Sequence, residues 1–62
     1  MNAASAYIKA MIAGRDIECG RIEQEHGLYG YPPEIVSIGL NAVDEGRDPH
    51  AAIDAYVSGG GA

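Results

Sequence analysis

A second cysteine is missing from this chain of 62 residues, in which Cys19 is the only one. The chain can therefore form no internal disulfide bond, and it cannot supply a zinc site built on several cysteines. A chain this short buries only about 60% of the surface that its unfolded form exposes, so its core alone gives marginal stability. Tight helical packing or association must add to it, and we expect self-association as a homodimer.

Long apolar runs and a basic leader are also missing. No segment approaches the run of about 18 apolar residues that a membrane-spanning helix needs. The first residues, MNAASAYIKAMIAG, contain neither a basic leader nor an unbroken apolar core. The single free cysteine suits a reducing compartment. We therefore expect a cytoplasmic protein that does not enter a membrane.

Positive charge is scarce, above all in the second half. The chain has 4 Lys and Arg against 9 Asp and Glu, for a formal net charge of −5. Residues 33–62 contain Arg47 as their only cation, against five acids. Such a surface repels a phosphate backbone, so we expect no direct binding of nucleic acid. Solubility is the simplest role for these acids, and contact with a basic partner or imitation of DNA phosphates is the alternative.

The clearest structural signals lie in the second half, which reads as a helix, a turn and another helix. Pro33 suits the first turn of a helix, where its missing N–H has no partner to lose. Gly46 suits the left-handed residue that follows the last turn. Asp48 and Pro49 are a favoured N-cap and a favoured first helical residue. These residues predict where one helix ends and the next begins.

The segment 33–45 is apolar on nearly every side, which is typical of a buried, central helix. Gly39 lies in its middle, where glycine costs stability unless another chain segment approaches closely. We therefore expect a close helix crossing at Gly39. The last helix is expected over residues 48–57.

Two further helices are expected in the first half. Asn2 or Ser5 can cap a helix that reaches about Ala13, and residues 16–26 predict a short second helix, with a brief extended stretch as the alternative. The first helix has a stripe of apolar residues at helical spacing, which comprises Ala4, Tyr7, Ile8, Met11 and Ile12.

Gly14-Arg15-Asp16 recurs 32 positions later as Gly46-Arg47-Asp48. In both copies we expect the glycine to end a helix and the aspartate to cap the next. The chain is thus predicted to be all-α, a compact bundle of three to four short helices arranged as two helical hairpins. Residues 1–58 form the single predicted domain, and the glycine-rich residues 59–62 a flexible tail.

Few residues could carry catalysis or bind a metal. Glu23 and His26 stand at i and i+3, half of the Glu-x-x-His pattern of di-iron bundles, and a dimer with Glu18 as a further ligand could complete it. A solvated helix end is the simpler interpretation. Cys19 could pair with His26 or His50 as a nucleophile, but so small a chain has little room for an oxyanion hole. We predict no enzyme activity, no metal and no cofactor.

Two places in the chain favour protein contact. Loops seldom leave large side chains such as Tyr29 and Tyr31 in solvent, so these pack under the helices or form a contact surface. Acids at the C-terminal end of the central helix oppose its dipole, which hints at a function, although a solvated helix end also accounts for them. The predicted partner-binding residues are Tyr29, Tyr31, Asp44, Glu45 and Arg47.

We expect a non-enzymatic protein-protein interaction module, a small acidic adaptor or inhibitor that binds and occludes a larger protein. A structural subunit of a homo-oligomeric assembly is the first alternative. A metal-binding helical dimer that uses Glu23 and His26 is the other.

Residues 28–57 resemble, in pattern, the ubiquitin-associated type of small helical module. The residues at that family's loop, its Ala-Leu step and its last helix are Tyr29-Gly30-Tyr31, Gly39-Leu40, and Asp48, Ala52, Ile53 and Tyr56. The chain departs from the pattern because the loop methionine is missing, Pro32-Pro33 is unusual and the connection between the helices is short. The resemblance implies binding of a peptide or protein through the loop and the last helix, and it does not specify ubiquitin as the ligand.

Overall fold

The computed structural model describes residues 2–60, and the part it describes is built of helices with no strand. The helices are α1 (Ala3–Ile12), α2 (Asp16–Glu25), α3 (Pro33–Asp44) and α4 (Pro49–Ala55), and the π-helical turn η1 (Tyr56–Gly60) continues α4. The prediction of a small all-α bundle is confirmed. Residues 61–62 of the predicted tail lie outside the described residues.

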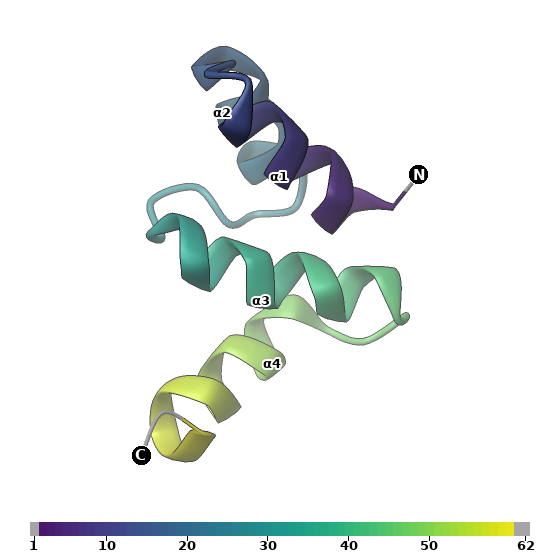
Figure 1. The fold of residues 1–62 in the computed structure, drawn as a ribbon. Coiled ribbons are helices and arrows are strands. Elements are labelled where there is room, and N and C mark those ends of the chain that lie inside the picture. Colours follow the sequence, from purple (N-terminus) through teal and green to yellow (C-terminus); the bar gives the residue numbers. More distant parts are fainter. Residues whose placement is uncertain (1, 61–62) are drawn as a thin grey trace.

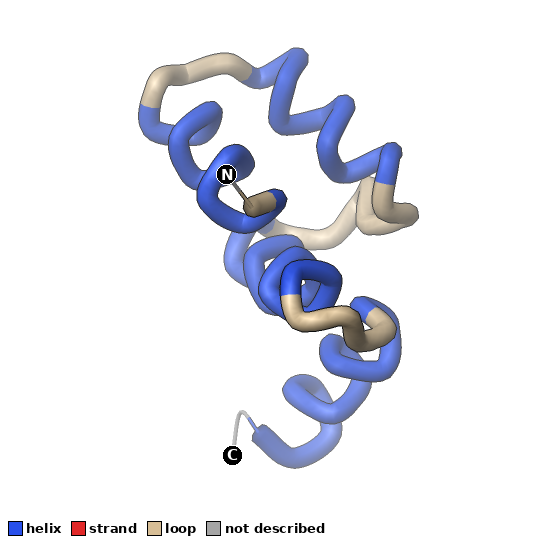
Figure 2. Tube along the Cα trace, turned by 90° about the vertical axis from the view of Figure 1, so that its right-hand side faces the viewer, coloured by secondary structure: helices blue, strands red, loops and turns tan. Residues whose placement is uncertain are grey.

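The central position of α3 is also confirmed. α3 contacts α1 on one side and α4 on the other, while α2 packs on α1 (Figure 1). The turned view shows the same order, with the α1–α2 hairpin above α3 and α4 below it (Figure 2). The far end of α4 and η1 extend away from the other helices in both views. No helix within residues 2–60 has the length and apolar character to cross a membrane.

The two Gly-Arg-Asp segments end their helices in the same way. Gly14 has a φ of 74° and Gly46 a φ of 76°, the left-handed conformation that glycine adopts without strain. The Gly14 N–H donates to the Met11 carbonyl at 3.1 Å, and the Arg15 N–H to the Ala10 carbonyl at 2.8 Å. The equivalent bonds at the second copy are also 3.1 and 2.8 Å long. Both turns are therefore Schellman motifs, which satisfy the last carbonyls of the helix.

The aspartates of the two segments behave differently. The Asp48 side chain caps α4 by accepting the Ala51 N–H at 2.9 Å, as predicted. Asp16 is the first residue of α2 instead, and the residue at its N-cap position, Arg15, makes no side-chain cap bond. The prediction of a cap at Asp16 is thus wrong. Pro49 explains the difference, because a proline holds the residue before it in the extended backbone that an N-cap requires.

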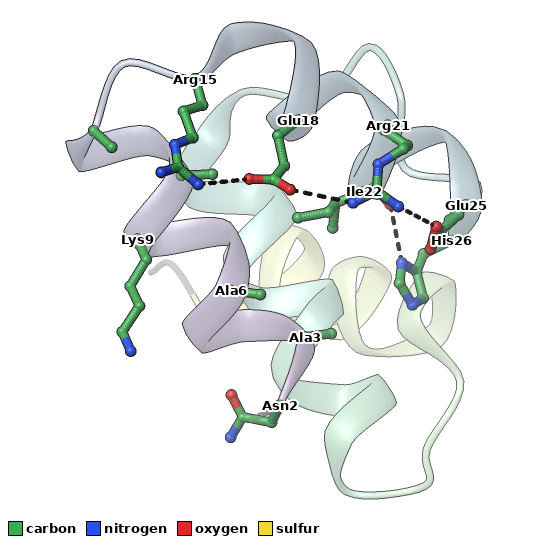
Figure 3. Close-up of a pocket in the computed structure, with 12 residues that line it drawn as sticks. Asn2, Ala3, Ala6, Lys9, Arg15, Glu18, Arg21, Ile22, Glu25 and His26 are labelled. Atoms are coloured by element: carbon green, nitrogen blue, oxygen red, sulfur yellow. Dashed lines mark hydrogen bonds and ion pairs between the residues drawn. The ribbon is translucent and has the colours of Figure 1, made fainter.

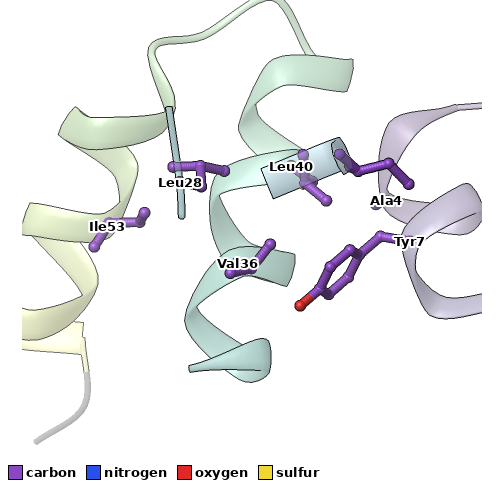
Figure 4. Close-up of a cluster of buried hydrophobic side chains, with 7 residues drawn as sticks. Ala4, Tyr7, Leu28, Val36, Leu40 and Ile53 are labelled. Carbon is purple, nitrogen blue, oxygen red and sulfur yellow. The ribbon is translucent and has the colours of Figure 1, made fainter. Parts of the chain in front are cut away.

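The core lies on both sides of α3. Val36 and Leu40 of α3 are fully buried, and side chains from α1, α4 and the loop after α2 surround them (Figure 4). The buried hydrophobic cluster comprises Ala4, Tyr7, Ile22, Leu28, Val36, Leu40 and Ile53. The described residues include no buried polar or charged side chain, so burial of apolar surface is the main source of stability.

The expected close approach at Gly39 is present. A Cβ atom added to Gly39 would lie 2.8 Å from Leu28 Cδ1 and 3.1 Å from Ile53 Cδ1. Both distances are shorter than ordinary carbon contacts. Side chains from the loop and from α4 thus occupy the space that a side chain at position 39 would need.

The apolar stripe predicted on α1 is wrong in part. Ala4 and Tyr7 are buried, but Ile8, Met11 and Ile12 are exposed, and Ala10 is buried in their place. The reason is that α2 packs on α1 from the side of its alanines, which leaves the larger apolar side chains uncovered. Helical spacing showed which residues share a face, and the position of α2 decided which face is covered.

Candidate protein-binding surface

The loop between α2 and α3 divides its large side chains between core and solvent. Gly27, at a φ of 69°, turns the chain out of α2, and the Leu28 N–H donates to the Glu23 carbonyl at 2.7 Å. Leu28 then points into the core and is fully buried, whereas Tyr29 is 67% exposed. Leu28 therefore packs under the helices, whereas Tyr29 is exposed and available for contact.

Tyr31 brings the loop to the start of α4. Its ring centroid lies 6.4 Å from that of His50, with the planes tilted by 52°. His50 also lies close to Gly27, since a Cβ there would be 3.5 Å from the His50 Nε2 atom. We call Tyr29, Tyr31 and His50 the loop–α4 surface. Sequence reasoning missed His50, because no local signal links it to a loop so distant in the chain.

Asp44 has a role inside the fold. Its Oδ1 atom accepts the Ala3 N–H at 2.9 Å, and its Oδ2 atom accepts the Ala4 N–H at 3.1 Å. Both N–H groups belong to the first turn of α1, which has no intrahelical partner for them. An acid at the end of α3 is therefore also an acid at the start of α1, where the helix dipole favours it. This contact explains why an acid occupies the C-terminal end of α3, which the local sequence alone did not explain.

Glu45 and Arg47 form an ion pair with each other in the turn between α3 and α4. Both side chains are exposed, so the pair contributes little to stability. This turn follows the C-terminal end of α3, whereas the loop with Tyr29 and Tyr31 precedes its N-terminal end (Figure 1). The length of α3 is about 18 Å at 1.5 Å per residue. The structure therefore does not gather the five predicted residues into one surface, and their role in binding stays a prediction.

The groups considered for metal binding make contacts within the fold. The buried Tyr7 hydroxyl donates to Glu23 Oε2 at 2.6 Å, and His26 Nδ1 lies 2.9 Å from the Ile22 carbonyl oxygen. Burial, and then the hydrogen bond to Glu23, raise the pKa of Tyr7 above its usual range. Within residues 2–60, no group of three or more His, Cys, Asp or Glu side chains is placed to hold a metal ion.

Cys19 is half-buried on α2. Burial, and then the negative charge of Asp16, raise the pKa of its thiol. A raised pKa keeps the thiol protonated, which is the opposite of what a nucleophilic cysteine requires.

A groove of about 740 Å³ runs between α1 and α2 (Figure 3). Alanines of α1 and Ile22 of α2 line it together with charged side chains, mostly from α2. Exposed ion pairs join Glu18 to Arg15 at 3.4 Å and to Arg21 at 3.3 Å, and Arg21 to Glu25 at 3.0 Å. These charges compensate one another, so the groove offers shape but no cluster of convergent polar groups.

Among the surfaces described above, the loop–α4 surface exposes the largest aromatic area, and the buried Leu28 holds its loop in place. Comparisons with protein-family models, curated proteins and solved structures found no match to this chain. The chain's own residues are therefore the basis for inferring its function.

Proposed function

We propose that this protein is a non-enzymatic binding module, a small acidic adaptor or inhibitor that docks on a larger protein through the loop–α4 surface. The exposure of Tyr29, at 67%, is the observation that carries the proposal. Tyrosine buries a large area on binding at a low cost in side-chain entropy, and it is enriched at the energetic centres of interfaces. A cytoplasmic location and a dimeric free protein belong to the same proposal.

The base of the loop supports this role. Leu28 is fully buried against Gly39, so the residue before Tyr29 is held in place. Tyr31 rests beside His50 on the other side of Tyr29. A loop anchored on both sides loses little conformational entropy on binding, which favours affinity.

Charge indicates the kind of partner. The helices α3 and α4, which border the loop, contain no Lys or Arg, and they carry Glu34 in the first turn of α3 and Asp54 on α4. Asp48 adds a further negative charge at the start of α4. A partner with an apolar pocket and a basic rim would complement this surface and associate faster at low salt.

The test is affinity capture from the native host lysate with the wild-type chain and two matched variants. Tyr29→Ala removes the exposed loop ring, and Tyr56→Ala makes the same change at the end of α4, where the ring is 42% exposed. We expect one stoichiometric partner for the wild type and for Tyr56→Ala. Tyr29→Ala should lower the affinity at least tenfold, as truncation of a central aromatic residue does.

A third variant separates the two groups of predicted residues. Glu45→Lys reverses a charge in the α3–α4 turn without touching the cap that Asp44 provides. If it abolishes capture while Tyr29→Ala has no effect, the binding surface is the turn and not the loop. Capture of no partner by any variant would contradict the whole proposal.

A structural subunit of a homo-oligomeric assembly is the second candidate. Apolar side chains are exposed in three other places, on α1, at Ile17 of α2, and on η1, where Val57 is 69% exposed. A subunit needs two separate contact surfaces to grow beyond a dimer. Mass measured against concentration distinguishes the candidates, because an assembly subunit must exceed the mass of two chains.

A further inference from the structure

The most extensive uncovered apolar area on a single helix is on α1. Ile8 is 43% exposed, Met11 40% and Ile12 83%. Their spacing of three and four residues places them side by side along α1, and we call these three residues the α1 face. Isolated exposed hydrophobic residues are ordinary, but a contiguous group on one helix is typical of an interface.

In the second hairpin the residue equivalent to Ile8 is covered, whereas the equivalents of Met11 and Ile12, which are Val43 and Asp44, are not buried. At the offset of 32 positions that aligns the two Gly-Arg-Asp segments, Ile8 corresponds to Leu40 and Ala10 to Ala42. Both alanines are buried, and Leu40 is fully buried as well, whereas Ile8 is not. Both α1 and α3 have two helical neighbours, but α2 and α3 leave Ile8 exposed on α1, whereas the neighbours of α3 enclose Leu40 (Figure 2).

The charges of the helices favour a second copy of this chain as the cover. α1 has a single charged residue, Lys9, and of the α-helices within residues 2–60 it alone has no acid. Two chains that each carry a net charge of −5 repel one another, and contact through any other α-helix would bring acids together. Contact through α1 avoids this and matches one apolar strip with an identical one.

We propose that two copies of this protein form an isologous dimer in which their α1 faces pack against each other. In such a dimer the same patch serves both subunits around a twofold axis, and the contact closes after two copies. Each copy would bury Ile8, Met11 and Ile12, which adds apolar burial to a core that is small for an independent domain. The inference deepens the dimeric part of the proposed function and rests on it.

The test is the mass of the purified protein over a wide range of concentration, by light scattering or sedimentation. Ile12→Glu places a charge on the α1 face at a side chain that is 83% exposed, so the fold should be retained. Val57→Glu adds the same charge at another exposed apolar residue, on η1. We expect the wild type and Val57→Glu to reach twice the mass of the 6.5 kDa chain, and Ile12→Glu to remain monomeric.

Salt provides a second readout that does not depend on mutation. Added salt screens the repulsion between the two acidic chains, so the apolar dimer should dissociate less readily as salt rises. A dimer held by opposite charges would show the reverse.

Three results would overturn the inference: a wild type that is monomeric throughout, a dimer that Ile12→Glu leaves intact, and a mass that grows beyond two copies. A monomeric wild type whose captured partner is lost in Ile12→Glu would mean that a different protein covers the α1 face. None of these results alters the effect expected of Tyr29→Ala on partner capture, so the loop–α4 surface is judged separately.

Discussion

The Gly-Arg-Asp turns of the two hairpins start alike and then diverge. Up to the arginine they are the same motif, with a left-handed glycine and two hydrogen bonds of equal length. After it, Asp48 caps α4 and Asp16 does not cap α2. The comparison teaches that glycine alone suffices to end a helix, whereas a cap also requires the backbone before the helix to be extended, which Pro49 ensures.

The hairpins also differ in how their helices are packed. In the second hairpin, the missing side chain of Gly39 allows Leu28 and Ile53 to approach α3, and Val36 and Leu40 on this helix are fully buried. In the first hairpin, α2 packs on α1 from the side of its alanines, and Ile8, Ile12 and Ile17 remain exposed. α1 and α3 each pack against two helices, but the neighbours of α1 leave Ile8 and Ile12 exposed, whereas those of α3 bury Val36 and Leu40.

The largest effect is expected from a substitution that disrupts the close contacts at Gly39. Gly39→Ala should destabilise the protein by about 2 kcal/mol, because the new Cβ would overlap Leu28 in a packed core. The measurement is the free energy of unfolding in urea.

Gly20→Ala is the matched control for that change, in the middle of α2. A Cβ at position 20 would meet nothing within 4 Å, so the substitution should stabilise the protein by about 0.5–1 kcal/mol through helix propensity. Equal effects of the two variants would show that the packing around Gly39 tolerates a Cβ atom.

The second largest effect is expected at Asp44, whose hydrogen bonds to α1 link the two hairpins. Asp44→Ala removes the acceptor for two N–H groups at the start of α1 and should cost about 1–2 kcal/mol. Asp54→Ala, on the exposed surface of α4, removes the same charge and should change the free energy of unfolding by less than about 0.5 kcal/mol. Similar losses for both would mean that Asp44 acts through net charge and not as a cap.

The smallest effects are expected at the aspartates of the two turns, Asp48 and Asp16. Asp48→Ala should cost about 1 kcal/mol because it removes a side-chain cap, and Asp48→Asn should restore most of that loss. Asp16→Ala should cost about 0.3 kcal/mol through the helix dipole, an effect that salt removes. If Asp16→Ala were as costly as Asp48→Ala at high salt, the two turns would be equivalent after all.

The candidate surface could be predicted only in part. Tyr29 and Tyr31 stood out because large residues are unusual in a loop, but the sequence did not show that Leu28 turns inward and Tyr29 outward. His50 and the capping role of Asp44 depend on contacts between residues far apart in the chain. Such contacts carry no local signal, because capping and periodicity describe neighbours within a few residues.

What the sequence determined by itself is the set of helices and most of their ends. Proline, glycine and aspartate act on the backbone within one turn, so Pro33, Gly46 and Asp48 can be interpreted from their immediate neighbours in the chain. The tertiary structure alone decided which faces are covered, that Asp44 serves α1, and that Ile8 stays in solvent while Leu40 does not. The physical reason is that a helix carries its apolar face wherever it lies, but burial requires a neighbour, and the position of a neighbour is a property of the whole fold.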